Sequence, residues 1–289
     1  MKNETVEYRR AIESLRAGVP NRDVVNFLPP EQENIRDKYI RILDDCLKNW
    51  EESGKKQTGL LLTAVFGAGK SHWLEYFRHI ALEKKFICSK VVLNKETPLH
   101  DLWKFYRACV LNAELPNGTG NALYEIVPGY DRSKAPHYRE LSQWTEKIKD
   151  DNSRFSSTLY LLDRSPDSEL LEKIIAEWTG ERSIQVKEMK DALKERGENI
   201  NFIVTRPNRA HIHLYFEFLS RFFYSRGFAG WVLLVDETEM ISRYSVRQRG
   251  KAYANLALLL GKLKEKIPGL IAVFTTTPDY AGQMLYGTR

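Results

Sequence analysis

A glycine-rich segment between two regular stretches limits the folds open to this chain. It reads Ala64-Val65-Phe66-Gly67-Ala68-Gly69-Lys70-Ser71 and fits the phosphate-loop pattern G-x-x-x-x-G-K-[ST], with alanine at the first glycine. An apolar run precedes it at residues 59–65, and an amphipathic stretch follows at 71–85. A strand, a tight loop and a helix in this order place backbone N–H groups against a phosphate. The segment therefore predicts a nucleotide site built on a strand–loop–helix unit.

The expected nucleotide contacts come from this loop and from the start of the helix. Glycines let the backbone turn its N–H groups toward phosphate oxygens. Lys70 is expected to bridge the β- and γ-phosphates and so to take part in catalysis, and Ser71 to hold Mg²⁺. The predicted ATP-binding set is Phe66, Gly67, Ala68, Gly69, Lys70, Ser71 and His72.

A second apolar run ends in two acidic residues and completes the pattern. Residues 231–237 read WVLLVDE. At the end of a buried strand, Asp236 is expected to hold Mg²⁺ through a water molecule. Glu237 would lie beside the γ-phosphate, where it could polarise an attacking water. An adjacent glutamate is typical of ATPases. The NKxD motif of GTPases is lacking, and no LSGGQ-like string indicates an ABC transporter.

Two further positions are candidate residues of the nucleotide site, and each has an alternative interpretation. Residues 269–277 form another apolar run, which ends in three threonines. One of them could touch the γ-phosphate or the attacking water, and we predict Thr276 in this sensor-1 role. Asn94 ends the run 86–94 and could hold Glu237 in an inactive orientation, although a simple loop role for this asparagine is favoured.

The order of strands and helices predicts an α/β fold, a P-loop NTPase of the AAA+ or ASCE type with a parallel sheet flanked by helices. We divide the chain into a helical segment (1–57), a core (58–112 and 208–289) and a mainly helical insertion (113–207). The expected helices of the insertion lie near 138–150, 155–163, 167–179 and 186–196, with a short strand at 201–205. Three further helices are expected outside the insertion. One begins at Thr97-Pro98, a second is capped by Asn208, and a third covers residues 246–266.

Composition excludes several classes. The formal net charge is +6, there are three cysteines without a CxxC pair, and no apolar run reaches the ~20 residues of a membrane span. We therefore expect a cytoplasmic protein without disulfides or zinc. A basic stretch follows Asp236, with Arg243, Arg247, Arg249, Lys251, Lys262, Lys264 and Lys266. It is either a solvated face or a surface that meets DNA or a neighbouring subunit.

With these motifs in place, the chain resembles the ATP-binding proteins of BREX-type phage-defence systems, the BrxD-like proteins. The resemblance lies in Ala11-Ile12 and the string Leu15-Arg16-Ala17-Gly18-Val19-Pro20-Asn21-Arg22-Asp23, in Phe66 through His72, in Ser89-Lys90-Val91-Val92, in Thr97-Pro98-Leu99-His100, in Val235-Asp236-Glu237-Thr238-Glu239 and in Thr276-Thr277-Pro278.

The resemblance implies ATP binding and hydrolysis by an AAA+-like protein. It would act with other defence-system proteins on double-stranded DNA, as a homo-oligomer. Members of the family carry further sequence after the fourth strand, whereas this sequence stops at Arg289. We therefore expect a truncated C-terminal lid, without sensor 2 or an arginine finger. Two functions remain open: an active ATPase, and a nucleotide-dependent scaffold or switch with little turnover.

Overall fold

The strands form one mostly parallel sheet. The computed structural model describes residues 29–50, 59–197, 204–205, 211–263 and 267–280, with isolated positions 6, 9, 10, 12, 13 and 16. In these residues the strands, in chain order, are β1 (Gly59–Thr63), β2 (Ile87–Val92), β3 (Ala113–Glu114), β4 (Trp231–Asp236) and β5 (Leu270–Thr276). Their spatial order is β1-β5-β4-β2-β3, and all neighbours except β2 and β3 are parallel. The four strands predicted from the apolar runs are confirmed.

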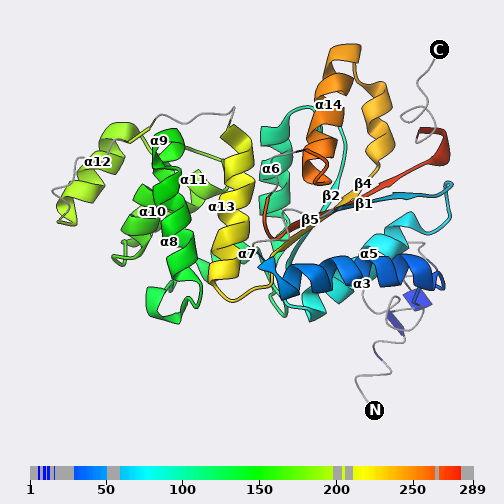
Figure 1. Ribbon diagram of the computed structural model, residues 1–289, viewed down its shortest axis with the longest axis horizontal. Coiled ribbons are helices and arrows are strands. Elements are labelled where there is room, and N and C mark those ends of the chain that lie inside the picture. The colour runs from blue at the N-terminus through cyan, green and yellow to red at the C-terminus, as the bar shows by residue number, and fades with distance from the viewer. Residues whose placement is uncertain are drawn as a thin grey trace.

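Helices cover both faces of this sheet, which explains why its central strands β4 and β5 are buried along their whole length. On one side, α3 (Glu33–Lys48) and α5 (Lys70–Glu83) pack on the face that includes Val232 and Leu234. On the other, α6 (Leu102–Leu111) and α14 (Val246–Leu259) cover the face that includes Leu233 and Val235 (Figure 1).

The edge beyond β2 differs from the expectation. The short strand β3 pairs antiparallel with β2 and was not predicted. It is fastened by the guanidinium of Arg78, which contacts both carboxylate oxygens of Glu114. The predicted helix start at Thr97-Pro98 is wrong, because α6 begins at Leu102, where the Asp101 carboxylate accepts a hydrogen bond from the Lys104 N–H. An aspartate cap satisfies a free helical N–H, which a proline cannot do.

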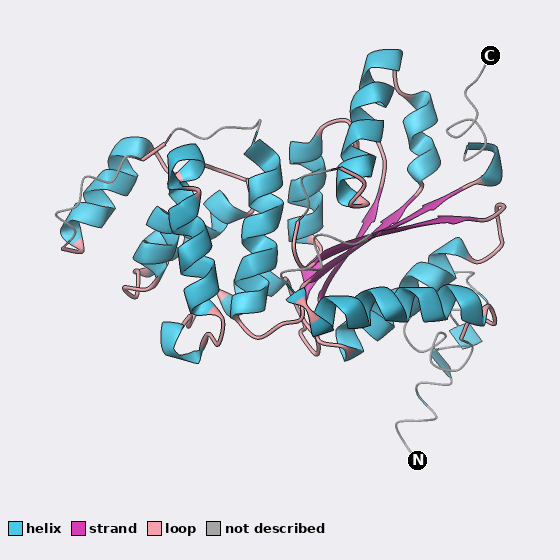
Figure 2. Cartoon of the chain, in the orientation of Figure 1, coloured by secondary structure: helices cyan, strands magenta, loops and turns pink. Residues whose placement is uncertain are grey.

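Helices fill the other half of the molecule, to the left in Figure 2. In chain order they are α7 (Ala122–Ile126), the 3₁₀ turn η1 (Arg132–Lys134), α8 (Tyr138–Lys147), α9 (Lys149–Asn152), α10 (Arg154–Leu162), α11 (Ser168–Trp178), α12 (Val186–Glu195) and α13 (Ile212–Ser225). The four helices expected in the insertion are therefore confirmed. The division of the chain into domains stays a prediction.

The aromatic stripe of α13 joins the helical half to the sheet. Phe218 stacks on Phe155 of α10 with ring centroids 4.4 Å apart. Two residues earlier, the ring of Phe216 lies 5.8 Å from the ring of Trp231 at the start of β4. One continuous apolar core thus runs from the insertion to the sheet. The aromatic stripe of α13 is part of this core.

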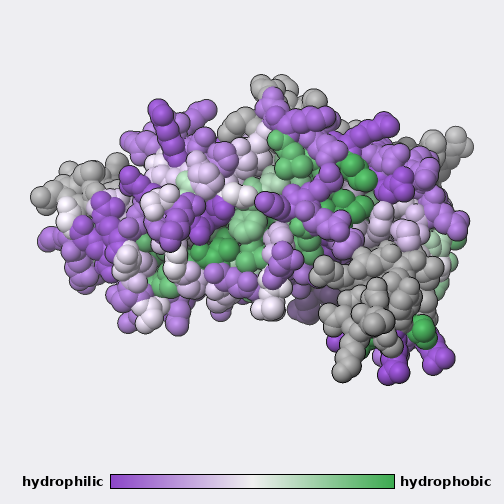
Figure 3. Space-filling model, turned by 90° about the horizontal axis from the view of Figure 1, so that it is seen from below, coloured by the Kyte–Doolittle hydropathy of each residue, from purple (hydrophilic) through white to green (hydrophobic). Residues whose placement is uncertain are grey.

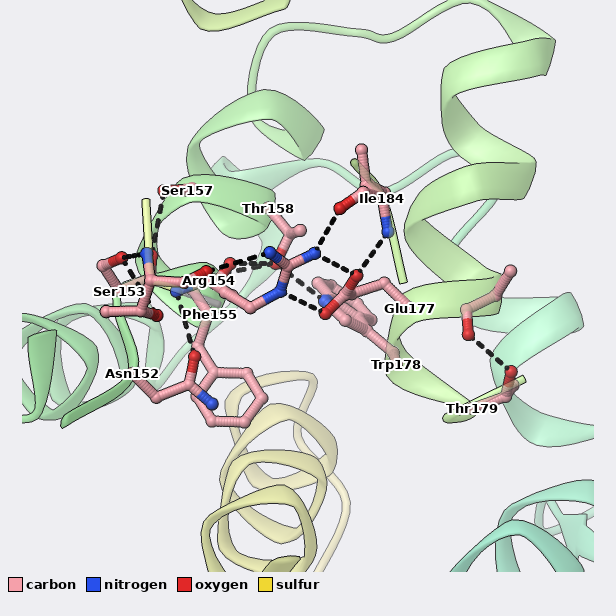
Figure 4. Close-up of polar contacts among 12 residues, drawn as sticks. Asn152, Ser153, Arg154, Phe155, Ser157, Thr158, Glu177, Trp178, Thr179 and Ile184 are labelled. Carbon is pink, nitrogen blue, oxygen red and sulfur yellow. Dashed lines mark hydrogen bonds and ion pairs between the residues drawn. The ribbon is translucent and has the colours of Figure 1, made fainter. Parts of the chain in front are cut away.

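A buried ion pair organises the helices of the insertion (Figure 4). The guanidinium of Arg154 donates two hydrogen bonds of 2.6 Å to the carboxylate of Glu177, and the two side chains are 1% and 2% exposed. The same guanidinium reaches the Ile184 and Thr205 carbonyls. Burying two charges is costly unless their hydrogen bonds are satisfied. This network therefore fixes α10 against α11 and the chain that follows.

One predicted helix is shorter than expected, and several predicted segments lie outside the described residues. The helix expected at 246–266 ends at Leu259, and Gly261 follows with a φ of 66°. Val204 and Thr205 are not in a strand, while the rest of 201–205, Asn208 and most of the string 15–23 lie outside the described residues.

The visible surface is largely hydrophilic. Seen from below, polar side chains dominate both ends, and hydrophobic ones gather in a strip through the middle (Figure 3). Among the helices of the described chain, none has the length and apolar character needed to cross a bilayer. Cys46, Cys88 and Cys109 are buried, and none of the three forms a disulfide.

We predict that Glu177→Gln lowers the free energy of unfolding by about 3–5 kcal/mol, because it leaves the buried guanidinium of Arg154 without a countercharge. Urea denaturation followed by circular dichroism measures this. The control is Glu188→Gln, which removes a partly exposed partner of Lys173 and should cost less than about 1 kcal/mol. Equal losses from both variants would contradict the structural role of the pair.

Candidate phosphate and metal site

The glycine-rich loop turns through two left-handed residues. Gly67 has a φ of 80°, and Gly69, which precedes the first residue of α5, has a φ of 82°. A Cβ at Gly67 would meet no atom within 4 Å, so the backbone conformation, rather than space, calls for glycine there. The loop delivers the chain directly into α5, whose first N–H groups have no side-chain cap. Free N–H groups at a helix start favour an anion.

Alanine at the position of the usual first glycine is accommodated. Ala64 is not among the described residues with positive φ, so a Cβ costs nothing there. Its N–H donates to the carbonyl of Thr276 over 3.1 Å, which ties the loop to the end of β5.

The loop meets the acidic end of β4 through a side-chain hydrogen bond. The hydroxyl of Ser71 donates to Oδ2 of Asp236 over 2.8 Å. Asp236 Oδ1 accepts from the hydroxyl of Thr275 and from the N–H of Glu237. Asp236 is 6% exposed, and these three donors offset the cost of burying its charge. The two motifs that the sequence paired are thus in contact.

Lys70 lies inside the same site. Its ammonium donates to the carbonyl of Ala64 over 3.3 Å and lies 3.9 Å from Oε1 of Glu239. Only 9% of the Lys70 side chain is exposed. The cation therefore faces the loop rather than solvent.

Glu237 has an unusual backbone. Its φ of 61° and ψ of 39° are left-handed, which is uncommon for a residue other than glycine and often marks a functional position. The 3₁₀ turn η3 (Thr238–Arg243) starts directly after it. Burial raises the pKa of Glu237, and the carboxylates of Glu239 and Asp236 raise it further. A carboxylate with a raised pKa is better suited to accept a proton near neutral pH.

The threonines at the end of β5 have distinct positions. Thr275 contacts Asp236, a role that the sequence analysis missed. The sequence signal that could have revealed this role is the alternation of side chains along β5. It places Ile271, Val273 and Thr275 on the face of the sheet that α5 covers. Thr276 is fully buried, and its hydroxyl has no hydrogen-bond partner among the described residues. Its contact with a phosphate or a water stays a prediction.

The remaining candidates lie around the loop. Phe66 is 93% exposed, and Ala68 closes a turn with its N–H on the Val65 carbonyl, while His72 lies in the first turn of α5. The Asn94 side-chain oxygen accepts from the N–H groups of Glu96 and Thr97, both over 2.8 Å. This is the turn contact of a loop asparagine.

The oxygen donors fit the predicted Mg²⁺. A hydroxyl and a carboxylate 2.8 Å apart are the ligand types that Mg²⁺ prefers, and it usually takes one or two carboxylates together with phosphate oxygens and water. Among the described residues no group of three or more His, Cys, Asp or Glu side chains could hold a metal ion. Ser71 and Asp236 are therefore the candidate ligands that the geometry brings together.

The basic stretch begins at this site. Ser245 and Gln248 form a capping box that starts α14 just after η3. Arg243, Arg247, Lys251 and Lys262 are exposed and Arg249 is half-buried, whereas Lys264 and Lys266 lie outside the described residues. Residues 240–263 contain no acidic side chain.

A comparison with known families agrees with the motifs. Residues 5–162 and 138–285 match the family described as BREX system ATP-binding protein BrxC/D. The chain belongs to this family. The resemblance expected from the sequence is thereby confirmed. No curated protein and no solved structure matches the chain.

We predict that Thr275→Val lowers the free energy of unfolding by about 1–3 kcal/mol, because it removes a donor from the buried Asp236 carboxylate. Thr275→Ser should keep most of that stability. The matched control is Thr276→Val, which removes a hydroxyl without a partner and should be neutral or stabilising. Chemical denaturation of the three variants checks this, and a larger loss for Thr276→Val would contradict it.

Proposed function

We propose that the chain binds ATP with Mg²⁺ at the phosphate loop and hydrolyses it as an AAA+-like ATPase. The observation that carries the proposal is the 2.8 Å hydrogen bond between Ser71 and Asp236. It joins the start of α5 to the carboxyl end of β4, where open α/β sheets bind their ligands. The description of the family as ATP-binding proteins supports the nucleotide.

The strand order supports the class. β5 lies between β1, which leads into the phosphate loop, and β4, which carries the acidic pair. An additional strand between these two is typical of ASCE-type P-loop NTPases, to which AAA+ proteins belong.

Each residue then has a distinct task. The N–H groups of the loop and of the first turn of α5 bind phosphate oxygens, and Lys70 bridges the β- and γ-phosphates. Ser71 and Asp236 hold the metal ion, which neutralises charge on the phosphates when it is bound. Glu237 orients a water molecule and accepts its proton. Thr276 remains our candidate for a contact with the γ-phosphate or that water.

The proposed setting is the cytoplasm, in an anti-phage defence system with partner proteins. Double-stranded DNA is the proposed macromolecular ligand, and a homo-oligomer the proposed assembly. The family description names the BREX system. The exposed cations of residues 243–262, without an acidic side chain among them, support a surface for phosphate backbones.

We predict that Lys70→Ala abolishes ATP binding, because backbone N–H groups alone do not replace its charge on the β- and γ-phosphates. Isothermal titration calorimetry measures the affinity. Lys147→Ala, at an exposed position on α8, is the control and should bind as the wild type does. Unchanged affinity in Lys70→Ala would remove the phosphate-loop assignment.

We predict that Glu237→Gln keeps ATP binding and loses turnover by about 10²–10⁴-fold, because an amide cannot accept a proton from water. Phosphate release, measured with and without double-stranded DNA, tests this. If turnover persists in the variant, Glu237 is not the base. If the wild type binds ATP without turnover under both conditions, the chain is a nucleotide-dependent scaffold or switch.

The DNA surface yields a separate prediction. Arg247→Glu with Arg249→Glu should weaken DNA binding uniformly across sequences and reduce its salt dependence, because fewer counterions are released. ATP affinity should not change. Fluorescence anisotropy over a salt series measures both effects, with Lys187→Glu and Lys190→Glu on α12 as the matched charge reversal. If ATP-dependent assembly collapses while DNA binding survives, this surface contacts a neighbouring subunit. If neither changes, it is a solvated face.

A further inference from the structure

A second carboxylate faces the phosphate site and has no part in the mechanism above. Glu239 lies in η3, two residues after Glu237. Its Oε1 is 3.9 Å from the ammonium of Lys70, and its side chain is 21% exposed. Its Oε2 is buried and has no hydrogen-bond partner among the described residues. A buried carboxylate oxygen without a hydrogen-bond donor destabilises the fold. The ion pair with Lys70 therefore offsets the desolvation cost of the Glu239 carboxylate.

Lys70 in turn depends on Glu239. In the described part of the chain, its ammonium contacts the Ala64 carbonyl and this carboxylate, and it also acts electrostatically on Glu237. A largely buried cation needs a countercharge close by. In a site without nucleotide, Glu239 supplies the negative charge that the β- and γ-phosphates would supply in an occupied one.

The two negative groups cannot share this position without repulsion. Like charges about 4 Å apart repel strongly where solvent screens them only in part. Phosphate oxygens that reach Lys70 therefore compete with the carboxylate of Glu239. A 3₁₀ turn has poorer hydrogen bonds than an α-helix, so η3 is a segment that can yield.

We propose that Glu239 is a positioning residue that holds the ammonium of Lys70 in the nucleotide-free site and releases it to the β- and γ-phosphates of an incoming nucleoside triphosphate. The inference rests on the proposed nucleotide site and adds the regulation of its phosphate-binding lysine. Glu239 then sets how tightly the loop binds phosphate.

The test compares Glu239→Gln with the wild type in the full chain. Calorimetry with ATP and with ADP is performed in Mg²⁺ and again in EDTA. Because the carboxylate competes with phosphate and not with the metal, the variant should bind ATP roughly tenfold tighter in both conditions. The gain should be smaller for ADP, which lacks the γ-phosphate. Glu96→Gln removes the same charge from an exposed loop at the same edge of the sheet and should change neither affinity by more than about twofold.

The outcomes separate this inference from the proposed function. Tighter binding in EDTA by Glu239→Gln alone supports the inference. Weaker binding in Mg²⁺ with unchanged binding in EDTA would make Glu239 part of the metal site and overturn it. Equal affinities of the variant and the wild type, or an equal gain in Glu96→Gln, would also overturn it while leaving the nucleotide site intact. No binding by the wild type under either condition would remove the proposed function itself. Thermal unfolding of both variants shows whether each is folded.

Discussion

The carboxylate of Asp236 is the group on which the site depends. It is a nearly buried charge at the end of a central strand, and its three donors come from different places: the hydroxyl of Ser71 on α5, the hydroxyl of Thr275 on β5 and the N–H of Glu237. Because a buried charge without donors is costly, this arrangement favours one register of β4 and β5 and one position of α5. The glycine-rich loop is thereby held beside the acidic end of β4.

Much of this arrangement could be predicted because local signals and chemistry coincide in the sequence. Continuous apolar runs identified the parallel strands, since both faces of the sheet are covered by helices. The helical period identified α8, α10, α11 and α12 in a region without a motif. The glycines and Lys70 predicted a tight loop between a strand and a helix, and the structure has left-handed Gly67 and Gly69 there, whereas the binding of phosphate by this loop stays a proposal.

The features that could not be predicted depend on contacts between distant segments. β3 is only two residues long, and it is held in place by the two-point ion pair between Arg78 and Glu114. Neither a two-residue strand nor such an ion pair produces a hydrophobic periodicity in the sequence. Thr275 could be told from its neighbours only once the faces of β5 were known. Glu239 resembles any acidic residue of a surface turn until the fold brings it to Lys70. Sequence patterns thus identified the elements, whereas the partners of individual polar side chains came from the tertiary structure.

The balance of charge in the site has a consequence for nucleotide entry. Burial and the carboxylates of Glu239 and Asp236 raise the pKa of Glu237, Lys70 and Arg243 lower it, and Glu239 also lies 3.9 Å from the ammonium of Lys70. A triphosphate adds further negative charge. Its binding therefore needs added positive charge or the removal of a carboxylate. A divalent cation at Ser71 and Asp236 would supply the first, and withdrawal of Glu239 would supply the second. Because Glu239 is also a cause of the raised pKa of Glu237, its withdrawal would remove that contribution to the pKa.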